Sequence, residues 1–408
     1  MNTIIKKWMS MSLLVKLLLG MIVGAIIGAI FGQSAMAIKP LGTIFLNLLQ
    51  MIALPLVICS LVTGIAGVSD MKTFGRCGGK ILTYYCITTL IAAAVALAIA
   101  ALIKPGVGFV LSETYDGAIG TMPNFFDTIV AMFPNNIFAS LSSGSYDHAL
   151  VFSIFMGLGI LMLPKEEGSS VYKFFELGLK ALNSMLKIVL IYAPIGVGAL
   201  VASVVGEYGT MFLTFAAKFL AVNYLSVIAM VAVYLLFLVI FGRMSPITFI
   251  KKAMPAVLTA IGTQSSAAVL PINMQCAEDM GAKKSVYGFT IPLGNQVNKD
   301  GTAILLACSF LFAAQAVGTP IGIGTLIQVI FLSLLLTAGS NSVAGGAVVV
   351  ITIVINTFGL PIETVTIVAG ALALIDGALT MCNTLGDLVG TMIVSASEDR
   401  REAKILSK

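Results

Sequence analysis

Long apolar runs alternate with short charged turns along almost the whole chain. A helix needs about 20 mostly apolar residues to cross a lipid bilayer. We therefore predict eight membrane-spanning helices, near residues 12–32, 41–68, 79–103, 125–164, 171–203, 211–241, 285–315 and 362–396. The fourth run is interrupted by the polar stretch SSGSYD (142–147), so we expect that helix to be broken.

Two further apolar stretches, 246–280 and 320–360, do not fit as full spans. Each has a polar, small-residue centre, GTQSSAA (262–268) and TAGSNSVAGG (337–346), and each flanking half is shorter than a span. We interpret both as re-entrant helical hairpins that enter from opposite faces of the membrane. A polar helix follows each hairpin, an order typical of inverted repeats. The predicted fold is an all-α polytopic membrane protein with eight transmembrane helices and two re-entrant hairpins.

The distribution of lysine and arginine indicates the orientation of these spans. With the N-terminus inside, the external loops hold only Lys39 and Lys104, whereas sixteen basic residues lie in the cytoplasmic segments. Because positive residues accumulate on the cytoplasmic side, we predict that both termini are cytoplasmic in a bacterial-type inner membrane. The net charge of +5 then reflects topology, and we expect no nucleic-acid partner.

The composition agrees with a membrane protein and argues against an enzyme. Hydrophobic residues make up 59% of the chain and charged residues 10%, whereas soluble domains carry roughly 25% charged residues. The six cysteines are scattered and His148 is the only histidine. Such a sequence has no histidine-rich metal cluster, catalytic triad or nucleotide-binding loop.

Three acids lie deep in the predicted membrane: Asp300, Asp376 and Asp387. A carboxylate there is costly, so it normally faces a cavity, an ion or a ligand. Asp376, Thr380, Asn383 and Asp387 are spaced by 4, 3 and 4 residues and therefore share one helix face. Polar contact between helices could explain Thr380 and Asn383, but hardly the two carboxylates.

The stretch NKDGT (298–302) interrupts a predicted helix with Asn, Asp and Gly together. Freed carbonyls beside a carboxylate and an amide suit a hard cation. Tyr85, Thr88 and Thr89 share a face of the third span and could complete an oxygen cage, or could simply pack between helices.

Four segments in order resemble the dicarboxylate/amino-acid:cation symporter family, which has the glutamate-transporter fold. They are TQSSAAVLPINM (263–274), PLGNQVNKDGT (292–302), SVAGGA (342–347) and DGALTMCNTLGDLVGT (376–391). The resemblance implies a homotrimer whose protomers each move a transport domain past a scaffold, an elevator mechanism. It assigns 1–78 and 105–210 to scaffold helices, and 79–104 and 211–408 to the transport domain.

The same resemblance implies the substrate site. Asp376 matches the acid that receives the substrate amino group, with Thr380 beside it. Asn383 and the backbone at Ser266 match groups that hold the α-carboxylate, and Val343 matches a gating contact. The remaining residues expected beside the substrate are Ser265, Thr302 and Leu379.

It also implies three cation sites, with Na⁺ favoured and H⁺ as the alternative coupling ion. The first matches Asp387, Asn383, Asn298 and the Gly294 carbonyl. The second matches Tyr85, Thr88, Thr89, Asn298 and Asp300. The third matches the carbonyls of Thr337, Ala338 and Ser340, with Gln296.

Two departures from the family pattern concern the substrate. Members that take acidic substrates carry an arginine three residues after the amino-binding acid, or in the first hairpin tip. Here these positions are Leu379 and Gln264. A buried substrate carboxylate without its guanidinium would lose roughly 2–5 kcal/mol. We therefore expect a small neutral amino acid such as serine, threonine or alanine.

A third departure is Lys299, where the family motif usually has methionine. Its ammonium could stand in for a bound cation or repel one. Alternatively, Lys299 pairs with Asp300 or another buried acid, or its head reaches water along the transport pathway.

The leading hypothesis is therefore a symporter for a small neutral amino acid, in contact with the lipid bilayer. The alternatives are a proton-coupled or cation-uncoupled amino acid carrier, a transporter of acidic amino acids or dicarboxylates, and a substrate-gated anion channel.

Overall fold

The computed structural model describes residues 13–66, 77–109, 133–143, 146–338 and 346–406, together with Met11 and Val130. All regular structure in these residues is helical, as the apolar pattern predicts. The N-terminal part contains α2 (Leu13–Phe31), η1 (Gly32–Ile38), α3 (Lys39–Ala66), α5 (Gly79–Ile103), α7 (Ile137–Ser142), α8 (Tyr146–Met162) and α9 (Lys165–Tyr208). The C-terminal part contains α10 (Thr210–Phe237), η3 (Leu238–Gly242), α11 (Pro246–Thr263), α12 (Ser266–Asp279), α13 (Lys284–Val297), α14 (Asp300–Ala316), α15 (Ile323–Ala338), α16 (Gly346–Thr357) and α17 (Glu363–Leu406).

Six helical segments in the described residues are long and apolar enough to cross a membrane. They are Val15–Phe45, Gly79–Ile103, Lys165–Tyr208, Thr214–Gly242, Val286–Ala316 and Leu374–Arg401. The first joins two of the predicted runs, because α2, η1 and α3 follow one another without a break. The structure therefore supports a polytopic membrane protein, while the count of eight spans stays a prediction.

The fourth predicted run differs from a single broken helix. Residues 133–136 are not helical, and α7 begins only after Asn136, whose side chain accepts hydrogen bonds from the amides of Phe138 and Ala139 at 3.0 and 3.2 Å. Pro134 has no amide proton to continue a helix, and Asn136 is a favourable N-cap. The prediction of continuous helix at 133–136 is therefore wrong, although α7 and α8 do separate near the predicted interruption.

The first predicted hairpin is present as two antiparallel helices. α11 and α12 meet at Gln264, which has a left-handed φ of 52°, and Ser265 caps α12 by accepting a hydrogen bond from the Ala268 amide. At the open end, Lys252 Nζ donates to the Asp279 carbonyl at 2.5 Å. In the second hairpin α15 and α16 are in contact, but the turn at 339–345 lies outside the described residues. That either tip enters the membrane stays a prediction.

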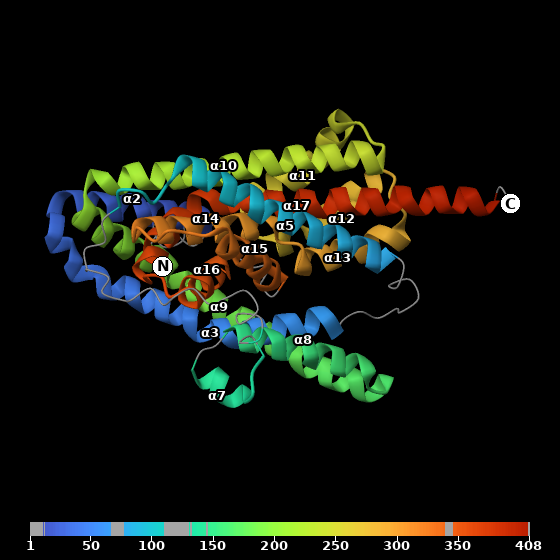
Figure 1. The fold of residues 1–408 in the computed structure, drawn as a ribbon, viewed down its shortest axis with the longest axis horizontal. Coiled ribbons are helices and arrows are strands. Elements are labelled where there is room, and N and C mark those ends of the chain that lie inside the picture. The colour runs from blue at the N-terminus through green and yellow to red at the C-terminus, as the bar shows by residue number, and fades with distance from the viewer. Residues whose placement is uncertain are drawn as a thin grey trace, which may run out of the picture.

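The helices pack in two groups. α2, α3 and α8 lie against the long helix α9, and α2 approaches α9 so closely that a Cβ at Gly24 would overlap the Gly198 carbonyl. Small residues commonly allow such close backbone approach in membrane helices. α5, α10 and α14 pack around α17, which runs along the length of the molecule (Figure 1).

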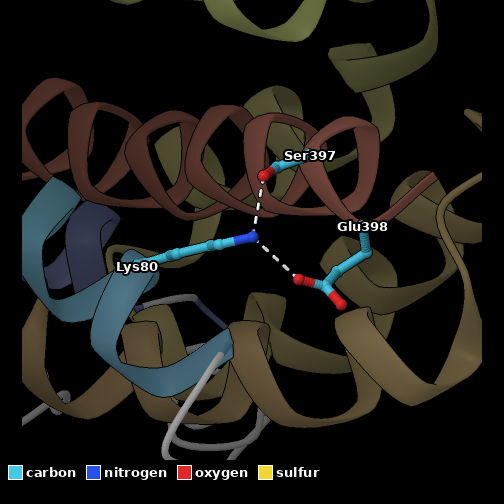
Figure 2. Close-up of polar contacts among 3 residues, drawn as sticks. All are labelled: Lys80, Ser397 and Glu398. Carbon is cyan, nitrogen blue, oxygen red and sulfur yellow. Dashed lines mark hydrogen bonds and ion pairs between the residues drawn. The ribbon is translucent and has the colours of Figure 1, made fainter. Parts of the chain in front are cut away.

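The C-terminal end of α17 extends beyond the predicted span and is tied to the other helices. Lys80 of α5 donates to Ser397 and to the buried Glu398, both at 2.8 Å (Figure 2). Lys283, just before α13, lies 2.7 Å from Asp399, and Arg400 donates to the Phe241 carbonyl of η3 at 3.1 Å. The apolar pattern could not predict this extension because its residues are polar.

Candidate functional site

The site forms where the helix after the first hairpin is broken. α13 ends at Val297, Asn298 and Lys299 are not helical, and α14 begins at Asp300. This is the interruption predicted from NKDGT. At such a break the last carbonyls of one helix and the first amides of the next lose their helical partners. The Gly294 carbonyl still accepts a hydrogen bond from the Asn298 amide at 2.8 Å.

α17 faces this break with its polar residues. Asp376 is half-buried, while Thr380, Asn383 and Asp387 are buried, as the 4, 3, 4 spacing predicts for one helix face. α12, α13 and α14 all contact α17. The polar face of α17 is therefore covered by protein rather than exposed on the surface of the molecule.

The structure brings together the residues of the first predicted cation site. Asn298 Nδ2 donates to Asp387 Oδ1 at 3.0 Å and to the Asn383 carbonyl at 3.3 Å. Gly294 lies against them, and a Cβ at this position would overlap the Asp387 carboxylate and the Tyr85 hydroxyl. The buried Asn298 Oδ1 receives no hydrogen bond from the described residues. An oxygen-only donor set with an unused acceptor fits a hard cation such as Na⁺.

The side chain of Asn383, a residue of this set, forms a hydrogen bond that the sequence did not predict. The Asn383 side-chain oxygen accepts a hydrogen bond from the Gly301 amide at 2.7 Å, at the beginning of α14. Only the Asn383 carbonyl therefore lies among the predicted cation ligands in this conformation.

The second predicted set surrounds Asp300, which is fully buried. Thr89 donates to Asp300 Oδ1 at 2.6 Å, so α5 and α14 meet at the break. Tyr85 donates to the Thr290 carbonyl at 3.0 Å, and Thr88 to the Tyr85 carbonyl at 3.2 Å. The side chains of Tyr85, Thr88 and Thr89 are all buried, and Thr89 is bonded directly to Asp300.

Tyr234 is a member of this site that the sequence analysis missed. Its hydroxyl donates to Asp300 Oδ2 at 2.5 Å, and it also lies 3.6 Å from the Cys382 sulfur. The only signal in the sequence was a tyrosine inside the apolar run VAVYLLF. A tyrosine hydroxyl that is buried among apolar residues needs a hydrogen-bond partner. Nothing in the sequence says that this partner is Asp300.

The third predicted cation site is only partly described. Thr337 is fully buried and donates to the Leu334 carbonyl at 3.2 Å, and Gln296 is half-buried on α13. Ala338 is the last residue of α15, and Ser340 lies outside the described residues. The assignment of these four residues stays a prediction.

The predicted substrate residues converge beside α17. At the first hairpin tip Gln264 and Ser266 are buried and Ser265 is half-buried. The end of α11 approaches α17 closely: a Cβ at Gly377, next to Asp376, would lie 2.8 Å from the Ile261 carbonyl oxygen.

On the other side of α17, a Cβ at Gly301 would overlap the Leu379 carbonyl, so α14 also lies directly on this stretch. Leu379 is 2% exposed and Thr302 is 9% exposed. Val343 lies outside the described residues.

Comparison with known proteins agrees with this geometry. Residues 13–397 match the model of the sodium:dicarboxylate symporter family. The chain belongs to this family. It is 32% identical to a proton/sodium-glutamate symport protein of Geobacillus stearothermophilus, over 89% of this chain and 88% of that protein. It is also 29% identical to a C4-dicarboxylate transport protein of Geobacter sp. (strain M21), over 91% and 87% of the two chains.

Membership of the sodium:dicarboxylate symporter family establishes the general activity. The protein is a cation-coupled symporter of a small solute in a membrane, and it is not an enzyme, as predicted. The names of the relatives refer to glutamate and to C4-dicarboxylates, so they do not support the expected neutral substrate.

Proposed function

We propose that this symporter takes up a small neutral amino acid, such as serine, threonine or alanine, together with Na⁺. The observation that carries the proposal is the absence of arginine from the sequence between Arg243 and Arg400, an interval that includes both hairpins, the α13–α14 break and the polar face of α17. Recognition of a buried second carboxylate normally uses the bidentate guanidinium.

The half-buried Asp376 supports an amino acid rather than an uncharged solute. Asp376 precedes Gly377, which lies against the end of α11 near the first hairpin tip, and Thr380 follows one turn further along α17. The Asp376 carboxylate would pair with the substrate amino group. The amide nitrogen of Asn383 and the first amides of α12 would hold the α-carboxylate, since a helix N-terminus favours an anion. Leu379 then borders the space for the side chain, which favours a small or mildly apolar group.

Na⁺ is the favoured coupling ion because the α13–α14 break offers oxygen ligands only. The Asp387, Asn298 and Gly294 group has an unused amide oxygen, and Asp300 lies next to it with hydroxyl partners. The ion is cargo, and its binding neutralises buried carboxylates so that the site can cross the membrane.

The elevator mechanism is part of the proposal. α5 and α10–α17 would move as the transport domain, and α2, α3, α7, α8 and α9 would form the scaffold, which corresponds to how the helices pack. The ties between the end of α17 and α5, η3 and α13 would keep the moving part rigid. We further propose a homotrimer in the inner membrane with both termini in the cytoplasm.

An acidic substrate is the second candidate, and it is favoured by the names of the relatives and by the buried Lys299. Lys299 is the only basic residue between Lys284 and Arg400. We rank this candidate lower because the Lys299 ammonium binds the Asn295 carbonyl and a lysine is a single-point partner for a carboxylate.

The two candidates are separated by uptake into proteoliposomes with an imposed inward sodium gradient. Labelled serine, threonine, alanine, aspartate, glutamate and succinate are compared at equal concentration. The proposal expects concentrative uptake of the neutral amino acids, which stops when a sodium ionophore collapses the gradient. Concentrative uptake of aspartate, glutamate or succinate with no uptake of the neutral amino acids would refute it.

A further inference from the structure

The cation-binding region contains a cation that belongs to the chain itself. Lys299 lies between α13 and α14, is 2% exposed, and donates from Nζ to the Asn295 carbonyl at 2.5 Å. The expectation that its head reaches water is therefore wrong for this conformation. The ammonium is held inside the protein, among the residues predicted to bind ions.

The immediate partner of Lys299 is the kind of ligand that a metal cation would use. The Asn295 carbonyl belongs to the last turn of α13, at the end of the helix where carbonyls begin to lack helical donors and where the helix dipole is negative. In transporters with broken helices, such C-terminal carbonyls coordinate Na⁺. Asn295 is not one of the predicted ligands, but its carbonyl is next in sequence to that of Gly294, which is. The ammonium therefore occupies a carbonyl of the kind that an ion would use, beside the predicted set.

The Lys299 ammonium lies near acids whose negative charge it can offset. Asn298 and Asp300 flank Lys299 in the chain, and Asn298 is bonded to the Asp387 carboxylate at 3.0 Å. Asp387 interacts electrostatically with the Lys299 ammonium. Asp300 receives hydrogen bonds from Thr89 and Tyr234, so its negative charge is solvated by hydroxyls.

The charges of the loaded site can be counted from these residues. The site contains three aspartates, Asp300, Asp376 and Asp387, and one lysine, Lys299, and the count takes all four side chains as ionised. A neutral amino acid enters as a zwitterion and adds no net charge. Two negative charges therefore remain, whereas an uncharged residue at position 299 would leave three. Net charge buried in a region that moves through a membrane is costly, so each remaining charge favours one bound monovalent cation.

We propose that the Lys299 ammonium acts as a tethered cation that replaces one Na⁺, so that this symporter couples about two sodium ions to each neutral amino acid. The ammonium travels with the transport domain in both directions and thus moves no net charge per cycle. This inference rests on the proposed function for the identity of the substrate, but not for the effect of Lys299 on the number of ions.

The test is the sodium dependence of substrate affinity in the purified protein, measured by calorimetric titration with serine. Because binding is linked, the slope of log Kd against log sodium concentration gives the number of sodium ions taken up with the substrate. Lys299→Met removes the charge and should make the slope steeper by one. For each tenfold change in sodium, Kd should change about tenfold more than in the wild type.

Two further variants make the comparison specific. Lys180→Met is the matched control, because Lys180 is an exposed residue of α9 that pairs with Glu176 and is distant in sequence from the α13–α14 break. The sodium slope of this variant should equal that of the wild type. Lys299→Gln keeps a donor for the Asn295 carbonyl while removing the charge. It should show the same steeper slope if Lys299→Met fails to fold.

A second measurement uses the wild type alone. The membrane potential at which net serine flux stops in proteoliposomes, at known serine and sodium gradients, gives the charge moved per serine, which should be about two. Three charges per serine, or equal sodium slopes in the wild type and both Lys299 variants, would overturn the inference. If the wild type binds aspartate or succinate but not serine, the proposed function fails, and the same slopes measured with that substrate still decide the role of Lys299.

Discussion

Gly294→Ala should weaken sodium binding strongly, because Gly294 lies at the closest approach of α13 to the predicted cation ligands. An added Cβ would overlap both the Asp387 carboxylate and the Tyr85 hydroxyl, so at least one of them must move. Inserting a methyl group into a packed site costs about 1–3 kcal/mol. If this cost falls on the ion-bound state, the sodium concentration for half-maximal serine uptake should rise about 5- to 150-fold.

Gly288→Ala is the matched control on the same helix. A Cβ at Gly288 meets no described atom within 4 Å, so this substitution makes the same chemical change without filling the site. Serine uptake is measured in proteoliposomes across a sodium titration for the wild type and both variants. We expect Gly288→Ala to behave like the wild type. A Gly294→Ala curve that coincides with the wild-type curve, in protein that elutes as the wild-type assembly, would refute the placement of the ion.

Three further substitutions test the remaining parts of the site. Asp376→Asn should abolish serine binding in calorimetry, because the substrate amino group loses its charged partner, while the detergent-solubilised protein keeps its oligomeric state. Unchanged affinity for serine would show that Asp376 does not bind the substrate. Leu379→Arg should weaken serine uptake and admit aspartate, since a guanidinium would then border the side-chain space; unaltered serine uptake would mean that Leu379 does not border that space. Tyr234→Phe removes one hydroxyl partner of Asp300 and should lower the free energy of unfolding by about 1.5–3 kcal/mol in the absence of sodium. Thermal denaturation measures this loss, and an unchanged Tm would show that the bond contributes little.

Local features of the site could be predicted from the sequence because they depend on neighbouring residues. The break at Asn298 and Lys299 follows from polar residues in an apolar helix, and the polar face of α17 follows from spacing alone. The hairpin at 246–279 follows from two short apolar halves around a polar centre.

Features that depend on distant packing could not be predicted. Tyr234 reaches Asp300 across 66 residues of sequence, and its apolar neighbours give no hint of that partner. The hydrogen bond from the Gly301 amide to the Asn383 side chain depends on how α14 packs against α17. The extension of α17 is stabilised by Lys80 and Arg400, polar contacts that an apolar pattern does not register.

The central claim is that a site without arginine selects a neutral amino acid, and calorimetric titration of the purified wild-type protein in sodium tests it most directly. Serine and aspartate are titrated separately under the same conditions, with potassium replacing sodium as the control. We predict sodium-dependent binding of serine and about 100-fold weaker binding of aspartate, because an unpaired buried carboxylate costs several kcal/mol. Aspartate binding as tight as that of serine, or tighter, would contradict it.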